Sequence, residues 1–546
     1  MKYSIKYSFL FIVLTICIFL FSCNDDWNNY YNNAVSSSDA NLYELIKQNS
    51  QISKFAKLIE ISGYDKILSA SQAYTVWAPD NESLSSVDTN TIDSVQARLI
   101  VENQIARFNN PTSVPSGKSI RMMNKKIYSY SDDGGISFGG KLLIEKNIIA
   151  NNGLLQITNG LIPYFSNLYE FITTNENTSS IADFISQFQE KLFDEALSIP
   201  IDNENGMIIY DSITTPYNRL FEYPRLGLGS INNEDSIYTM LVPTNAAWKT
   251  AYERIAPYFK VYNKNQLYAD SVSNVQTSLA IVNNLIFRGR IPDPYAVDSL
   301  ISTYTTFMYY NLGQKTVIHE VKDLFGGSEK TTASNGLIYL TGNLNLDNVG
   351  TWNPPIVIEA ENTNGRVTGS NTTISSRIVT IGSPIQDVSG GRYIFIEPTN
   401  SSSQASVTFS IPDVLSCKYN IYIDLLPSID DNNVFSNDST MLAFNLSYMG
   451  SDGTLKTATA SNSPEYTTSG TQKVRMEIFS EFEFPVSNYV DQLWYMNPQN
   501  KPENLVATTT LTIRTNVTTQ QVTSTLYTRR FSIDAIIFEP IQNKVN

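Results

Sequence analysis

Two segments in the first third of the chain have apolar residues at the same helical spacing. The segment NLYELIKQN begins at Asn41, and NLYEFITTN begins at Asn167. In both, apolar residues recur every three or four positions, which is the pattern of an amphipathic helix. The repetition predicts that one domain occurs twice in the chain.

Each copy continues into an alternating strand that ends in a proline, YTVWAP and then YTMLVP. Proline has no N–H to donate, so it ends a strand ladder. The polar pairs that follow, Asp80 with Asn81 and Thr244 with Asn245, are expected to accept backbone N–H bonds at the start of the next helix. A loop that contacts an adhesion partner is the other interpretation of these residues, although strand stops and helix caps explain all of them.

A third shared block closes each copy, NNGLLQITNGLIP and then SNGLIYLTGNL. Asn-Gly between apolar alternations predicts a tight hairpin, because both residue types tolerate positive φ. The order of blocks resembles the fasciclin domain, whose boxes usually read like TVFAPTNEAF and NGVIHVIDGVLLP. Gln104 and Asn284 stand where that family usually has histidine.

The fasciclin resemblance implies two α/β domains and a role in cell adhesion or protein interaction. The second copy has a longer path between its blocks, so it carries an insertion rich in Pro, Gly and Asn. The expected ranges are 41–165 for the first domain and 166–346 for the second, with the insertion near 199–233.

The last third of the chain changes to short alternating segments separated by Ser, Thr, Asn and Gly. A linker is expected at 347–355, where Pro354 and Pro355 interrupt the pattern. Seven or more alternating segments with turn signals between them predict a β-sandwich over 356–546. The segments are PIVIEAEN, GRYIFIEP, ASVTFSIPD, YNIYIDLLP, VRMEIFSEFEF, NLVATTTLTIRT and FSIDAIIFEP. The predicted fold class is therefore multidomain α+β.

The opening IVIEAEN and the closing IDAIIFEP resemble the jelly-roll carbohydrate-binding modules of families 6 and 35. That resemblance implies a glycan ligand and a structural calcium at Glu359, Glu361 and Asp534. Calcium takes six to eight oxygen ligands, so three carboxylates with backbone carbonyls would suffice. Solvated acidic residues at strand edges are the alternative.

Modules of this type usually stack an aromatic ring on a sugar. The candidates for this role are Tyr489, Trp494 and Tyr495. Aromatic area with a polar edge suits the apolar face of a pyranose. Large aromatic side chains are mostly buried in proteins, so a purely structural role for the three stays open.

The first residues are typical of a lipoprotein signal peptide. Lys2 and Lys6 precede an apolar run from Phe9 to Phe21, and LFSC resembles a lipobox that ends at Cys23. We expect the signal to span 1–22, with lipidation of Cys23 and a tether over 23–40. The acidic pair after Cys23 resembles the export tag of surface-exposed outer-membrane lipoproteins.

Charge and side-chain chemistry narrow the functional classes. The formal net charge is −14, which repels nucleic acid. His319 is the only histidine, so Ser-His-Asp or Cys-His catalysis would have to use this one residue. We therefore expect that the protein is not an enzyme.

The expected function is a lipid-anchored adhesion or binding protein that captures glycan or a partner protein at the outer membrane. The alternative is a structural accessory of an outer-membrane nutrient-import complex that binds no carbohydrate. The ligand, the oligomeric state, and the choice between partner docking and a spacer role for the fasciclin-like pair are left open.

Overall fold

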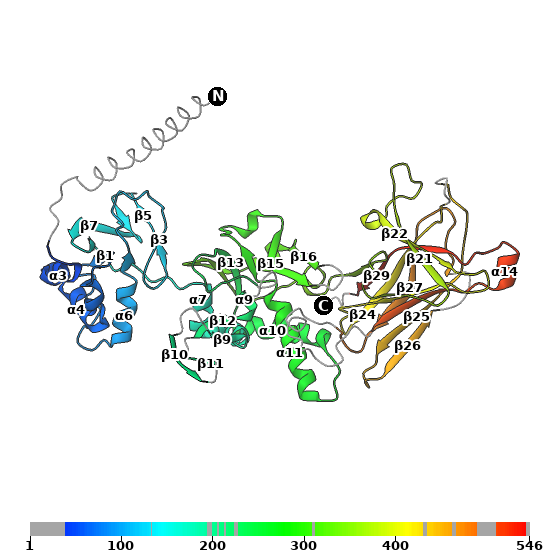
Figure 1. The fold of residues 1–546 in the computed structure, drawn as a ribbon, viewed down its shortest axis with the longest axis horizontal. Coiled ribbons are helices and arrows are strands. Elements are labelled where there is room, and N and C mark those ends of the chain that lie inside the picture. The colour runs from blue at the N-terminus through cyan, green and yellow to red at the C-terminus, as the bar shows by residue number, and fades with distance from the viewer. Residues whose placement is uncertain are drawn as a thin grey trace, which may run out of the picture. The chain divides into compact units, whose positions relative to one another are not determined.

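The structure is a computed structural model that describes residues 39–541, except for 133, 194–198, 205–206, 212–213, 223–227, 308–311, 430–433, 461–465 and 489–508. The chain divides into two compact units, Met1–Phe165 and Ser166–Asn546. The first is a mixed α/β domain, and the second joins another α/β domain to a β-sandwich (Figure 1). The predicted multidomain α+β fold class is confirmed. None of the described helices is long and apolar enough to cross a membrane.

The first unit is built on a six-stranded sheet in the order β2-β1-β8-β7-β6-β5. The helices α3, α4 and α6 gather beside it in Figure 1 and bury Ile46, Phe55 and Val101 in one core with β1 and β8. A short hairpin, β3 (Ile120–Arg121) with β4 (Ile127–Tyr128), adds to this unit. The sheet strands are β1 (Tyr74–Pro79), β2 (Ile105–Arg107), β5 (Tyr130–Ser131), β6 (Ser137–Phe138), β7 (Lys141–Ala150) and β8 (Gly153–Thr158), and the helices are α3 (Leu42–Gln48), α4 (Ser53–Ser62), α5 (Tyr64–Leu68) and α6 (Ser94–Glu102).

The second unit opens with a sheet of the same size in the order β16-β15-β14-β13-β18-β17. The segment before β13 adds two antiparallel strand pairs, in which β9 pairs with β12 and β10 with β11. Its strands are β9 (Gln189–Phe193), β10 (Ile199–Glu204), β11 (Met207–Asp211), β12 (Thr214–Asn218), β13 (Tyr238–Pro243), β14 (Ile286–Arg288), β15 (Leu300–Phe307), β16 (Leu312–Ile318), β17 (Glu329–Ala333) and β18 (Gly336–Thr341). Its helices are α7 (Leu168–Thr174), α8 (Ser179–Ser186), α9 (Arg219–Glu222), α10 (Asn245–Ile255), α11 (Gln266–Val282) and α12 (Val321–Phe325).

The two α/β domains share one strand register, which confirms the internal repeat. Tyr74 pairs with Gly153 at the start of the parallel pair β1 and β8, and Tyr238 pairs with Gly336 at the start of β13 and β18. Asn41 and Asn167 begin α3 and α7 with the same capping box, in which the asparagine and a glutamate three residues later satisfy each other's backbone N–H groups.

The two predicted hairpins form, but their turn residues are 151–152 and 334–335, and the glycine of each Asn-Gly pair begins the second strand. A Cβ on Gly153 would lie 2.1 Å from the carbonyl oxygen of Tyr74, and one on Gly336 would lie 1.9 Å from that of Tyr238. Both glycines are therefore needed for the close approach of a parallel strand, and Gly153 also has a positive φ of 156°. The asparagine before each glycine accepts the backbone N–H of the first helix, from Leu42 in one domain and Leu168 in the other.

The cap prediction is right for Thr244 and wrong for the two asparagines, while Asp80 accepts the backbone N–H of Ser83 at 2.9 Å as expected. Thr244 caps α10, whereas residues 81–86 of the first copy form turns instead of an α-helix. Asn81 accepts the backbone N–H of Lys54 in α4, and Asn245 accepts that of Ser180 in α8, each at 2.9 Å. The asparagines thus cap the helix that precedes the strand, because the strand end brings them beside it.

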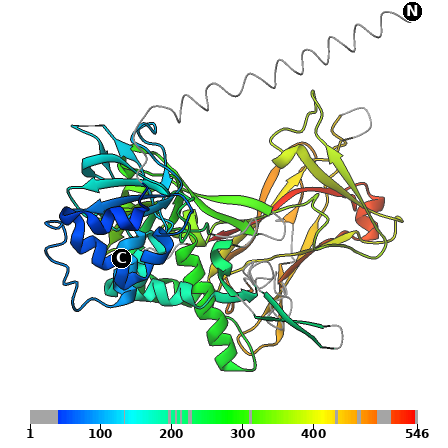
Figure 2. The same ribbon diagram turned by 60° about the vertical axis from the view of Figure 1, so that its left-hand side comes forward.

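The C-terminal part is a sandwich of two sheets that enclose one core (Figure 2). One sheet has the order β21-β22-β29-β24-β27, with β19 also paired to β29, and the other has the order β20-β23-β28-β25-β26. Every segment that predicted a strand here contains one. The strands are β19 (Ile356–Glu359), β20 (Arg366–Thr368), β21 (Thr372–Ile378), β22 (Arg392–Pro398), β23 (Ser406–Ser410), β24 (Lys418–Leu426), β25 (Leu442–Met449), β26 (Leu455–Ala460), β27 (Val474–Glu483), β28 (Thr510–Thr515) and β29 (Phe531–Pro540), with the short helix α14 (Thr519–Thr523).

The second α/β domain packs on the sandwich around Trp352, which is 6% exposed. The Trp352 ring lies 4.8 Å from that of Tyr258, centroid to centroid. The backbone N–H of Ser416, in the sandwich, donates to the carbonyl oxygen of Tyr258 at 2.8 Å. Cys417 packs against the cores of both domains. The segment expected as a linker is thus held by apolar contacts.

Candidate ligand groove

A groove of about 410 Å³ lies on the sandwich, on the face of the β24–β27–β29 sheet that points away from the core. Its size falls within the range of small-molecule sites in proteins. We call it the ion-pair groove. It is lined by Pro355, Val357, Asp387, Val388, Ser389, Asp424, Lys473, Arg475, Asp534, Ala535, Ile537 and Glu539.

A β-bulge places Asp534 in the groove. On β29, Ala535 pairs with Asp424 and Ile533 pairs with Leu425, so Asp534 is the extra residue. Ile533 and Ile536 both face the core, and the bulge accounts for their three-residue spacing. A bulge of this kind re-aims a side chain. Here it brings the fully buried Asp534 carboxylate beside Asp424.

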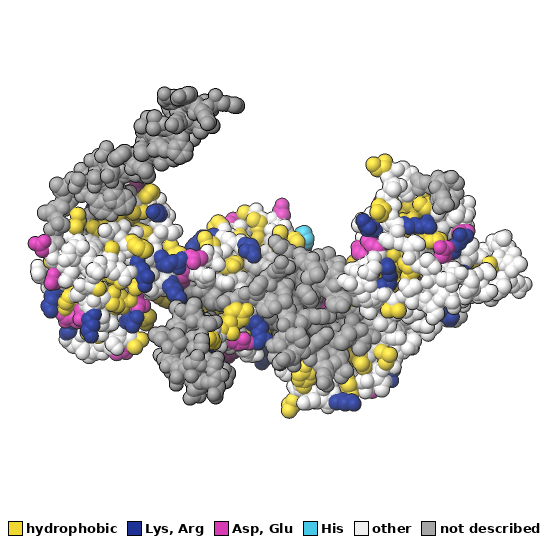
Figure 3. Space-filling model, viewed as in Figure 1, with side chains coloured by type: hydrophobic (Ala, Val, Ile, Leu, Met, Phe, Trp, Pro, Cys, Tyr) yellow, Lys and Arg dark blue, Asp and Glu magenta, His cyan; other side chains and the backbone are white. Residues whose placement is uncertain are grey.

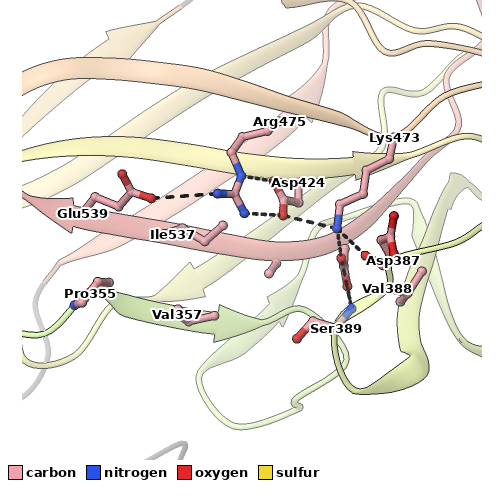
Figure 4. Close-up of a pocket in the computed structure, with 12 residues that line it drawn as sticks. Pro355, Val357, Asp387, Val388, Ser389, Asp424, Lys473, Arg475, Ile537 and Glu539 are labelled. Atoms are coloured by element: carbon pink, nitrogen blue, oxygen red, sulfur yellow. Dashed lines mark hydrogen bonds and ion pairs between the residues drawn. The ribbon is translucent and has the colours of Figure 1, made fainter. Parts of the chain in front are cut away.

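The register between β24 and β27 places two basic residues in the groove. Arg475 pairs directly with Asp424 across β24 and β27, and Lys473 comes just before β27. Arg475 holds Asp424 through two bonds, Nε to Oδ1 at 2.8 Å and Nη2 to Oδ2 at 2.9 Å. Lys473 Nζ lies 2.8 Å from Asp534 Oδ2 and 3.5 Å from Asp424 Oδ2. Figure 4 shows the chain of contacts continuing to Glu539, whose Oε1 lies 3.9 Å from Arg475 Nη1.

Burial and charge act against each other in this network. Burial lowers the pKa of Lys473, but the carboxylates of Asp534 and Asp424 outweigh it, so the pKa lies above the ordinary value. The bond to Asp424 likewise raises the pKa of Arg475. Both side chains therefore stay charged at neutral pH, and the groove holds a fixed row of alternating charges over Val357 and Ile537.

The three residues named for calcium lie near this groove. Ser389 connects two of them: its backbone N–H donates to Asp534 Oδ1 at 3.0 Å and its hydroxyl to Glu359 Oε1 at 2.6 Å. The Oε2 atoms of Glu359 and Glu361 are buried with no hydrogen-bond partner. Burial raises the pKa of Glu361, and the charges of Glu359 and Asp534 raise it further.

The two glutamates thus fit a cation, while the Lys473 ammonium already neutralises Asp534. Within the described ranges, no group of three or more His, Cys, Asp or Glu side chains is arranged to hold a metal ion. The calcium site stays a prediction.

The other residues singled out in the sequence lie elsewhere. Cys23, Tyr489, Trp494 and Tyr495 are outside the described residues. His319 is exposed and is coloured cyan in Figure 3. On the sandwich face shown there, basic and acidic side chains lie next to each other rather than in patches of one sign.

Sequence reasoning missed Asp424, Lys473, Arg475 and Glu539. Two signals could have found some of them. Asp424 interrupts the apolar end of the strand YNIYIDLL, and Lys473 and Arg475 share one face of KVRMEI. A charge inside a strand that is buried on both faces needs a partner. Which partner it has depends on the register of β24, β27 and β29.

A second hollow of about 540 Å³ lies at the end of the sandwich, between the loop after β22 and the segment after α14. Arg529 lines it, but its guanidinium donates to the carbonyl oxygens of Ser401 and Val517. Arg530 is paired with Asp438 at 2.9 Å. Loops form most of its wall, whereas strands position the ion-pair groove, and strands hold a site with more precision.

No protein-family model matches the sequence, and no curated protein matches it. Among solved structures, a FAS1 domain pair from the insect cell adhesion molecule fasciclin I is 14% identical, over 56% of this chain and 99% of that one, with a TM-score of 0.21. A xylan-binding domain from CBM 22 is 12% identical, over 33% and 92% of the two chains, with a TM-score of 0.20. The CBM22-1 xylan-binding domain from Paenibacillus barcinonensis Xyn10C is 10% identical, over 34% and 93%, with a TM-score of 0.22. These scores lie below 0.5, so the fold description rests on the strand orders and registers above.

Proposed function

We propose that this protein is a lipid-anchored binding protein of the outer membrane, exposed at the cell surface, whose sandwich captures glycan in the ion-pair groove. The observation that carries the proposal is the fixed row of donors and acceptors from Glu539 to Ser389. Sugar hydroxyls both donate and accept hydrogen bonds, so they match the carboxylate oxygens of this row and the N–H groups of Arg475 that Asp424 does not occupy. Val357 offers apolar area to the C–H face of a ring, with a smaller contribution from Ile537, which is 6% exposed.

The groove is also prepared in advance. Asp424 and Asp534 are held by ion pairs and by strand backbone, so little conformational entropy is lost when a ligand binds. The two α/β domains then serve as the adhesive or spacing part between the membrane anchor and the sandwich.

A steric substitution tests the groove. We expect Val357→Trp to fill it and to weaken the retention of the full-length protein on polysaccharide arrays by at least about tenfold, the equivalent of about 1.4 kcal/mol. The matched control is Val367→Trp, because Val367 is 61% exposed on β20 of the other sheet. Equal retention of the two variants would place the ligand elsewhere, and no retention of the folded wild-type protein on any glycan would overturn glycan capture.

The location is tested separately. Asp25 and Asp26 follow Cys23, so we expect external protease to remove the protein from intact cells. Cys23→Ala should release the protein from the membrane fraction, because lipid chains supply the membrane affinity. A protein that survives protease until the outer membrane is broken faces the periplasm instead.

A further inference from the structure

The Lys473 ammonium of the ion-pair groove is already engaged by the protein itself. Lys473 Nζ has three hydrogens, and three oxygens surround it. These are Asp534 Oδ2 at 2.8 Å, the main-chain oxygen of Asp387 at 2.6 Å and Asp424 Oδ2 at 3.5 Å. Lys473 therefore has no N–H left to direct at an anionic ligand.

Arg475 is committed only in part, because two of its five N–H groups bond the protein. Its Nε and Nη2 hold both oxygens of Asp424, whose side chain is only 4% exposed. A ligand carboxylate or sulfate that took over Arg475 would leave the buried Asp424 without its closest cation. Leaving a buried charge unpaired is strongly unfavourable, so the exchange opposes binding.

The remaining charge of the groove is negative. Its lining contains four carboxylates, Asp387, Asp424, Asp534 and Glu539, but only two basic residues, Lys473 and Arg475. Two of the carboxylates lie where a ligand can reach them, since Asp387 is exposed and the Glu539 side chain is 44% exposed. Figure 4 places them toward opposite ends of the row.

We infer that the ion-pair groove selects its glycan by charge: it prefers sugars that carry a protonated amine, accepts neutral sugars and rejects carboxylated or sulfated ones. The inference rests on the proposed function and adds the class of ligand. Glu539 and Asp387 provide the acceptors for the amine. Anions are disfavoured by the net negative charge of the lining, by the engaged Lys473 ammonium and by the pairing of Arg475 with buried Asp424.

Three hexasaccharides of one size test the selection, namely those of glucosamine, N-acetylglucosamine and glucuronic acid. Binding to full-length protein is measured by calorimetry at about pH 6, where the amine is largely protonated. We expect the amine hexamer to bind about fivefold more tightly than the acetylated one, as for a partly exposed charge pair, and the acidic hexamer to bind most weakly. Added salt should reduce these differences, because it screens exposed charges.

Because the whole protein is acidic, a charge-matched control is needed. Glu539→Gln should reduce the preference for the amine, whereas Glu483→Gln, an exposed glutamate of β27 outside the groove, should leave it unchanged. Equal binding of the amine, neutral and acidic hexamers overturns the inference, and so does an equal effect of the two variants. Binding of no hexamer by protein that retains a polysaccharide on arrays overturns the charge selection alone, while absence of retention on arrays overturns the proposed function first.

Discussion

At the scale of single residues, Glu361 is the clearest case of a side chain whose charge the fold disfavours. Its Oε2 is buried without a hydrogen-bond partner. Burial raises its pKa above the ordinary value of 4.5, and the nearby Glu359 and Asp534 carboxylates raise it further. An acid with a raised pKa holds its proton more tightly in the folded state than in the unfolded state. Its favourable contribution is therefore present below the unfolded pKa and is lost as the pH rises through the folded value.

Glu361→Gln removes this titration. In the presence of a chelator, we expect the variant to unfold at a temperature a few degrees above that of the wild type at pH 7, and to lose this advantage below about pH 4. Thermal unfolding by circular dichroism measures the effect, with exposed Glu483→Gln as the control. If calcium binds at Glu359 and Glu361, adding it should stabilise the wild type but not Glu361→Gln. A variant that is less stable than the wild type at pH 7 in chelator would contradict the expectation.

At the scale of elements, the parallel strand pair is the feature that both α/β domains share. Its start is crowded, because a glycine lies against the carbonyl oxygen of a tyrosine in each domain. The preceding asparagine then holds the first helix, so one turn fixes both the sheet register and the helix position. A side chain at the glycine would displace strand and helix together.

Gly336→Ala tests this arrangement. We expect a loss of about 1–3 kcal/mol in the free energy of unfolding, the range for an added methyl group that forces a backbone shift. The control is Gly342→Ala, because a Cβ on Gly342 would meet nothing within 4 Å. Urea unfolding of the two variants gives the comparison. Equal midpoints would show that the strand pair absorbs the methyl group.

At the scale of the whole molecule, the contact between the second α/β domain and the sandwich buries Cys417 and so controls its reactivity. Trp352 and Cys417 lie in this contact, and Asn353 Nδ2 lies 3.8 Å from Cys417 Sγ. Burial raises the pKa of the Cys417 thiol to about 11. Because the thiolate is the reactive form, native Cys417 should react slowly with alkylating reagents.

Trp352→Ala should loosen this contact and expose the thiol. Truncation of a buried tryptophan removes about 3–5 kcal/mol of packing, so we expect alkylation of Cys417 at pH 8 to become at least about tenfold faster. Peptide mass spectrometry follows Cys417 by itself. Trp77→Ala is the control, because Trp77 is fully buried in the first unit. Labelling of Cys417 that is no faster in Trp352→Ala than in the control would mean that the two domains do not protect the thiol jointly.

Most of the fold could be predicted from local sequence patterns. The capping boxes at Asn41 and Asn167, the strand stops at Pro79 and Pro243, and seven strands of the sandwich are readable because each depends on neighbouring residues. The sequence reasoning left out β20, β21, β25 and β26. Three of these, β20, β21 and β26, are edge strands with many exposed residues, so their apolar alternation is weak. β25 alternates clearly and could have been found.

By itself, the sequence determined the repeat, the order of domains, the sandwich and the acidic balance that disfavours nucleic acid. Only the tertiary structure decided which charges meet. Asp424 and Arg475 are 51 residues apart, and Lys473 and Asp534 are 61 apart. Their pairing depends on the register of three strands and on one bulge in β29, which no short stretch of sequence encodes. Backbone patterns are local, whereas a binding site is assembled from segments that meet only when the sheet has formed.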